Sequence, residues 1–122
     1  MVRILSFTLL IALLLPFGSL AGNSARNFGG VGIDGLPMAD GQIVVKQLVI
    51  GGPAQMAGIR VGDIITHIDG KPTKGSIFRH MVDYRLRGLS GTKVQLNILH
   101  PGEKKPLVFI LKRKQLVVEN RK

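Results

Sequence analysis

A charge-free apolar run near the N-terminus limits how much of this chain can fold into a domain. The run Ile4–Phe17 follows the short basic start Met1–Arg3 and precedes the small residues Ser19–Ala21. This order is typical of a secretory signal peptide over residues 1–21, with cleavage after Ala21. A retained membrane anchor is the alternative. For that role the 14 residues of the run, which include Pro16, are few, because about 20 apolar residues span a bilayer.

The rest of the chain is long enough for one small domain. Removal of residues 1–21 leaves 101 of the 122 residues, which can build a core of their own. The absence of cysteine excludes disulfides, cysteine-ligated metals and a cysteine-linked lipid anchor. Without Arg3, 16 of the 17 basic residues remain against 7 acidic ones, a net charge of about +9. This charge suits anionic surfaces or acidic ligands, whereas the scarcity of aromatic residues argues against nucleic acid.

Short β-rich stretches alternate with glycine- and proline-containing breaks. Pro53 and Gly58 suit the first position of a short helix and the residue just past its end, and Asp69-Gly70 predicts a tight turn. Ser76 is predicted to cap a longer helix that Gly88 ends. The expected strands are 42–50, 64–68, 92–99 and 106–112, the last two forming a hairpin, and the expected helices are 53–57 and 76–87.

These elements predict an α+β, mostly β fold. We expect a small, partly open β-barrel or sandwich with one short and one long helix. Residues 22–27 form a flexible lead-in, and residues 119–122 form a basic tail.

The predicted helix 76–87 carries more apolar surface than packing on one core requires. At 100° per residue, its apolar arc is roughly twice the stripe of about 100° that a surface helix buries. Either a ligand or another part of the chain, such as residues 114–118, could cover the excess. The apolar positions, in order around the cylinder, are Leu86, Val82, Phe78, Met81, Ile77 and Tyr84.

Two glycines interrupt an apolar stretch, Phe28–Ile33, that is otherwise suited to a strand. Gly30 and Gly32 weaken a strand there, because glycine has high backbone entropy and no side chain to pack. Their presence indicates either a bend in the chain or the close approach of another group to the backbone.

Several motifs of this chain resemble those of one family. Gly30-Val31-Gly32-Ile33 resembles the glycine–apolar–glycine–apolar carboxylate loop of PDZ domains. Gly52–Gly70 is similar to the bacterial PDZ pattern around its short helix. The resemblance is closest to the PDZ domains of C-terminal processing (tail-specific) peptidases and covers residues 28–118. The later motifs that support it are Leu86–Gly88, Gly91–Val94 and Pro101–Glu103.

The resemblance implies capture of a peptide. PDZ domains typically bind an extended C-terminal peptide as an added strand between a sheet edge and the long helix. By position, the backbone N–H groups of Val31, Gly32 and Ile33 would receive the ligand carboxylate, as a concave run of amides can. Gly30 and Gly32 would give the carboxylate access, and Val31 and Ile33 would form the pocket for the last side chain.

The resemblance also predicts the two long walls of the groove. On the strand side, Asp34 and Gly35 would continue from Ile33 and pair with the peptide. Pro37 cannot donate to a ladder, so this strand must be short, and Asp34 places a negative charge near the carboxylate loop. The helix wall would present Ile77 and Met81 or, in the alternative register, Phe78 and Val82. Either register implies a preference for an apolar residue two positions before the ligand's end.

The sequence predicts no catalytic or metal site. Ser90 and Lys93 are close in sequence but fall in an exposed turn, without the positioned base and oxyanion site that nucleophilic catalysis needs. His67, His80 and His100 fall on a strand, a helix and a turn, without the spacing of metal ligands. We therefore expect no enzymatic activity and no cofactor.

Together these features favour an exported, stand-alone PDZ module. It would capture C-terminal or extended peptides of partner proteins in a bacterial periplasm or outside the cell, as an adaptor for an envelope peptidase or assembly. One alternative is a basic structural protein that associates with anionic envelope polymers or lipids. Another is a subunit that completes a protease in trans. Dependence on a free ligand carboxylate distinguishes the first from the second, whose binding fades with salt.

Overall fold

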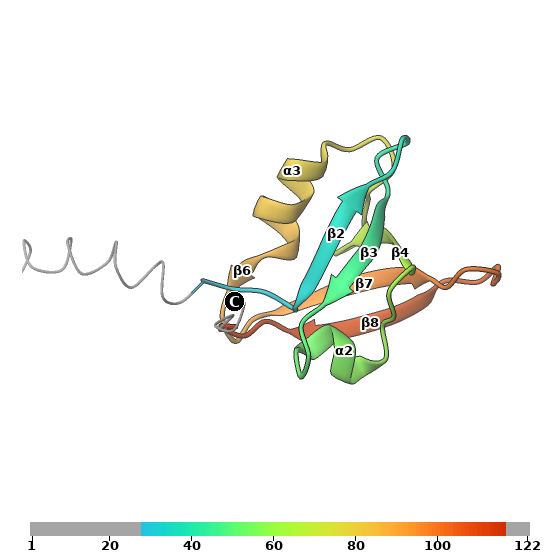
Figure 1. Ribbon diagram of the computed structural model, residues 1–122. Coiled ribbons are helices and arrows are strands. Elements are labelled where there is room, and N and C mark those ends of the chain that lie inside the picture. Colours follow the sequence, from blue (N-terminus) through green and yellow to red (C-terminus); the bar gives the residue numbers. More distant parts are fainter. Residues whose placement is uncertain (1–27, 117–122) are drawn as a thin grey trace, which may run out of the picture.

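The computed structural model describes residues 28–116, which form an antiparallel sheet with two helical segments against it (Figure 1). The six-stranded sheet has the order β2-β3-β4-β7-β8, with β5 paired to β4, and a two-stranded sheet joins β1 to β6. The strands are β1 (Phe28–Gly29), β2 (Ile33–Pro37), β3 (Ile43–Leu48), β4 (Ile64–Ile68), β5 (Lys71–Pro72), β6 (Gly88–Leu89), β7 (Lys93–Leu99) and β8 (Leu107–Lys112).

The local turn signals act as the sequence predicts. The short helix α2 spans Pro53–Ala57 and ends at Gly58, whose φ of 102° is the left-handed conformation that glycine adopts readily. Asp69 and Gly70 have φ values of 49° and 81°, as in the turns that suit two-residue hairpins, and they connect β4 to β5. The predicted 92–112 hairpin is present as β7 paired to β8.

One face of the six-stranded sheet carries the core. Alternate residues of β3 and β7 are buried, whereas β4 buries Ile65 and Ile68, which lie on either side of a register shift. Met81 and Leu86 reach this core from the long helix. The sheets remain open and do not close into a barrel. The prediction of a mostly β fold that is not a closed barrel, with one short and one long helix, is therefore confirmed. The core residues are Val31, Ile43, Val45, Ala54, Ile59, Ile65, Ile68, Met81, Leu86, Val94, Leu96, Ile98 and Leu111.

The long helix differs from its prediction at its start and in its hydrogen bonding. It begins with the α-helix α3 (Phe78–Met81) and continues as the π-helix η1 (Val82–Leu86). Ser76 does not cap it: Ile77 holds the N-cap position, and the Ser76 hydroxyl donates to the Pro72 carbonyl at 2.8 Å. The Ser76 hydroxyl, which was expected to cap the helix, therefore forms a hydrogen bond within the preceding turn instead.

The leader at 1–21, the lead-in at 22–27, the end of the predicted domain at 117–118 and the tail at 119–122 lie outside the described residues. Within 28–116, no helix has the length and apolarity that crossing a membrane requires.

Candidate peptide-binding groove

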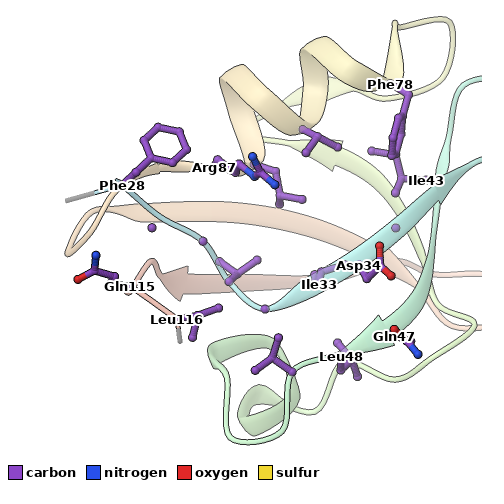
Figure 2. A pocket seen from close by; sticks show the side chains of 18 residues that line it. Phe28, Ile33, Asp34, Ile43, Gln47, Leu48, Phe78, Arg87, Gln115 and Leu116 are labelled. Carbon is purple, nitrogen blue, oxygen red and sulfur yellow. The ribbon is translucent and has the colours of Figure 1, made fainter. Parts of the chain in front are cut away.

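A groove of about 700 Å³ separates the edge strand β2 from the long helix (Figure 2). β2 pairs with β3 on one side only, so its other edge faces α3 and η1. A free strand edge can accept a further strand through its unpaired N–H and C=O groups. The groove is lined by residues 28–35 and by Ile43, Gln47, Leu48, Val49, Phe78, Val82, Leu86, Arg87, Gln115 and Leu116.

The loop before β2 is anchored by its carbonyl groups. The Val31 carbonyl accepts from the Ala54 N–H, and the Gly32 carbonyl accepts from the Val49 N–H, both at 2.9 Å. These bonds hold the loop against the turn that enters α2. They also direct the backbone amides of the loop away from that turn.

Those amides are available at the groove. The N–H groups of Val31 and Gly32 donate to no other residue of the 28–116 segment. The Val49-to-Gly32 bond flanks the Ile33–Leu48 pair, which makes this a non-hydrogen-bonded pair of the antiparallel ladder. The Ile33 N–H therefore points away from β3, toward the free edge. Three successive donors thus lie where an anion can be held without a charged side chain.

Glycine is required at two positions of this wall. Gly32 has a φ of 81°, and a Cβ there would lie 3.2 Å from the Cβ of Val49. A Cβ on Gly35 would lie 2.6 Å from Cγ2 of Ile43. Gly35 follows a register shift in the β2–β3 ladder, so the absence of its side chain lets Ile43 reach the groove floor. A Cβ on Gly30 would contact nothing within 4 Å.

The helix presents Phe78 and Val82 to the groove. Phe78 projects from α3 toward Ile43 and β2 (Figure 2). The other pair lies elsewhere: Met81 is 4% exposed in the core, whereas Ile77 is 62% exposed and lines a separate hollow. Of the two registers left open by the sequence, the geometry thus brings the Phe78 edge to β2. The π-turn continues this edge to Leu86, which also lines the groove.

The expected loop and strand residues also lie at the groove, with different exposure. Val31 is 2% exposed and packs in the core, so its contribution to the lining is mainly backbone. Ile33 is half-buried and Asp34 is exposed, both on the groove side. Asp34 is the one carboxylate among the groove-lining residues of the described segment.

Sequence reasoning missed several groove residues. Phe28, Gln115 and Leu116 lie at the end of the groove away from Phe78, and Arg87 lies at the end of the helix (Figure 2). Gln47 and Leu48 reach it from β3. Gln47 could have been found from its pairing with Asp34 across the β2–β3 ladder. That pairing is known only once the register of the two strands is known. Residues 115 and 116 belong to the segment 114–118 that could cover the helix by the sequence alone, but their position at the groove follows only from the fold.

The three histidines lie in three separate contacts of the described segment. Oδ1 of Asp63 lies 2.6 Å from Nδ1 of His100, and this buried contact joins residues 37 positions apart in the sequence. His67 contacts the Thr66 hydroxyl, and the His80 ring lies against Tyr84. Among residues 28–116, no three His, Asp or Glu side chains form a group that could hold a metal ion.

The sheet order, the free β2 edge and the facing helix are those of a PDZ domain, and the family comparison agrees. Residues 44–98 match the model of the PDZ domain. Residues 44–98 are thus identified as part of a PDZ domain, a class of domain that serves as a binding module.

The relatives are C-terminal processing proteases. The chain is 34% identical over 93 residues to carboxy-terminal processing protease CtpB of Bacillus subtilis (strain 168), covering 76% of this chain and 19% of that protease. It is 40% identical over 80 residues to the carboxy-terminal-processing protease of Bartonella bacilliformis, covering 66% of this chain and 18% of the relative. The chain thus spans less than a fifth of either protease.

Solved structures give the same fold. The photosystem II D1 C-terminal processing protease aligns with a TM-score of 0.71 at 27% identity, over 84% of this chain and 27% of that chain. The PDZ domain of the carboxy-terminal protease from Vibrio cholerae, solved in complex with a peptide, aligns with a TM-score of 0.66 at 24% identity. That alignment covers 75% of this chain and 98% of that domain.

Proposed function

We propose that this chain is an exported module that captures the C-terminal end of a partner protein by adding it as a strand to β2. The observation that carries the proposal is the set of Val31, Gly32 and Ile33 amides at the head of a free strand edge, opposite an apolar helix face. A terminal carboxylate fits these donors, and the ligand backbone fits the edge. The PDZ domain from Vibrio cholerae, with its bound peptide, supports this mode by analogy of fold.

We also propose that the module acts without chemistry of its own, as an adaptor that presents a protein end to an envelope peptidase or assembly. The relationship to C-terminal processing proteases supports a role beside such an enzyme. A subunit that completes a protease in trans is the nearest variant of this role. The two differ in the partner's response: an adaptor delivers substrate to an enzyme already active, whereas a completing subunit switches the enzyme on.

Binding to a panel of peptides with varied C-termini tests the proposal. Protein purified after export from cells expressing the full chain is titrated with each peptide and with its C-terminally amidated copy. We expect an apolar last residue to be preferred and amidation to abolish binding. Binding that survives amidation contradicts the carboxylate site. Mass spectrometry of the same sample tests export, since cleavage after Ala21 leaves Gly22 as the first residue.

A second candidate function is association with an anionic surface. A hollow of about 410 Å³ behind the helix is lined by Lys71, His80 and Arg85, and no carboxylate of the described segment lines it. Binding to vesicles containing anionic lipid, measured over a range of salt concentrations, distinguishes this role. A surface-associating protein would lose binding as salt rises and would ignore the peptide carboxylate.

A further inference from the structure

A buried arginine connects the far end of the groove helix to the sheet. Arg113 is 7% exposed, and it forms no ion pair with any carboxylate in residues 28–116. Its guanidinium instead donates to four neutral acceptors. These are the Leu86 carbonyl (3.0 Å from Nε), the Arg85 carbonyl (2.7 Å from Nη2), and the Thr92 hydroxyl and Lys93 carbonyl (2.9 and 3.0 Å from Nη1).

Two of these acceptors are at the end of the groove helix. The last carbonyls of a helix have no partner within it, and a cation there is favourable because the helix dipole is negative at that end. Arg113 therefore completes the hydrogen bonding of η1 at Arg85 and Leu86, and it holds that end against β7. Gly88 is shaped for this contact, because a Cβ there would lie 2.8 Å from Cζ of Arg113.

The next residue holds the opposite wall. Lys114 and Gly30 exchange two backbone hydrogen bonds, of 3.0 and 3.1 Å, at the start of the carboxylate loop. Consecutive residues after β8 thus anchor both the helix and the loop. The distance between the two walls, where the loop faces the end of the helix, is therefore fixed through residues 113–114.

We propose that Arg113 is a positioning residue for peptide binding, which sets the spacing between η1 and the Gly30–Ile33 loop. This inference rests on the proposed function of the groove. A groove held at its bound spacing avoids the cost of ordering its walls when a ligand enters, so affinity rises without a new contact. Arg113 does not line the groove, so an effect on peptide affinity must act through the walls.

The test compares Arg113→Lys with Asp63→Asn. Lysine keeps the charge but cannot hold the helix carbonyls and β7 with one planar fork. Asp63→Asn weakens another buried polar pair, with His100, away from the groove. In folded protein we expect Arg113→Lys to lower peptide affinity about tenfold, in line with the loss of preorganisation, and Asp63→Asn to leave affinity unchanged. Wild-type affinity in folded Arg113→Lys overturns the inference.

Two further measurements separate positioning from general destabilisation. Combined with Val82→Ala, Arg113→Lys should give a non-additive effect on affinity, whereas Asp63→Asn should add simply. Hydrogen exchange needs no ligand. The amides of Val82–Leu86, and those of Gly30, Val49 and Ala54 that form the hydrogen bonds of the loop, should exchange faster in Arg113→Lys, while those of β4 should not. Equal acceleration everywhere, or none in the two walls, contradicts the inference.

The same design separates this inference from the proposed function. If the wild-type protein binds no peptide, the proposed function fails, while the exchange measurement still decides whether Arg113 fixes the two walls. If Arg113→Lys does not fold, Gly88→Ala replaces it, since its added methyl group displaces the guanidinium without removing it. Unchanged affinity and unchanged wall exchange in folded Gly88→Ala contradict the inference.

Discussion

Two glycines share a left-handed backbone but differ in their surroundings. Gly32 has a φ of 81° and lies in the Gly30–Ile33 loop, the proposed carboxylate site, against Val49 and Leu116. Gly51 has a φ of 79°, with nothing within 4 Å of the position of its Cβ, and it does not line the groove. The pair distinguishes the backbone strain of an added methyl group from its effect on the site.

We predict that Gly32→Ala abolishes peptide binding and that Gly51→Ala does not. Each substitution should cost about 1–2 kcal/mol of stability, because an L-residue is strained in the left-handed region. Only at Gly32 must the loop also move to separate the new Cβ from Val49, which disturbs the three amides. Calorimetric titration with a C-terminal peptide, beside thermal unfolding of both variants, checks this. Equal affinities in the two variants would contradict the assignment of the loop.

Asp34 should favour peptides that carry a basic residue a few positions before their C-terminal residue. It is an exposed carboxylate on the groove side of β2, with no ion pair to a described residue. A lysine or arginine near it in the bound peptide should gain about 0.2–1 kcal/mol, the range of an exposed pair. Asp34→Lys should reverse the preference between basic and acidic peptides, and Glu103→Gln, in the distant β7–β8 turn, should leave it unchanged. A preference insensitive to Asp34→Lys would contradict this role.

At the scale of the elements, the sequence predicts best where one local pattern decides. The residues of α2 and β4 were predicted to the residue, because proline, glycine and alternating apolar residues act within a few positions. The start of the long helix was wrong, since the Ser76 hydroxyl has a competing acceptor in Pro72. The register of its groove face was left open, because periodicity shows apolar positions but not which of them the core takes.

The groove face of the helix gives a third prediction. Val82→Ala should lower peptide affinity, because it removes apolar area from the wall that a ligand side chain contacts, at about 25 cal/mol per Å². Phe78→Ala should do the same with an added loss of stability, since Phe78 also packs against the core. Ile77→Ala is the matched control, because Ile77 is exposed on the other side of the helix. A larger loss of affinity in Ile77→Ala would show that the ligand uses the opposite edge.

For the whole molecule, the sequence could predict the family and the motif of the loop but not the contacts that join distant segments. The Arg113 bonds span 20 to 28 residues of sequence, and the Asp63–His100 pair spans 37. Neither follows from a local pattern, since each depends on the strand order. The return of Leu116 to the loop has the same cause. Long-range polar contacts of this kind depend on the sheet order that brings their partners together.

The Asp63–His100 contact should stabilise the fold without serving the groove. Asp63 is 1% exposed and accepts from the Arg60 N–H at 2.8 Å as well as contacting His100, so one carboxylate joins the loop before β4 to the turn after β7. Asp63→Asn should lower the free energy of unfolding by about 1.5–3 kcal/mol, the range for a hydrogen bond to a charged group. Urea unfolding measures this loss.

Because neither residue of the pair lines the groove, peptide affinity of the folded variant should equal that of the wild type. The His100→Asn variant should lose a similar amount of stability, and the double variant should lose less than the sum of the two, since both substitutions break one contact. Full additivity would show that the two side chains act separately. A loss of affinity in folded Asp63→Asn would show that the groove depends on this end of the sheet as well as on Arg113.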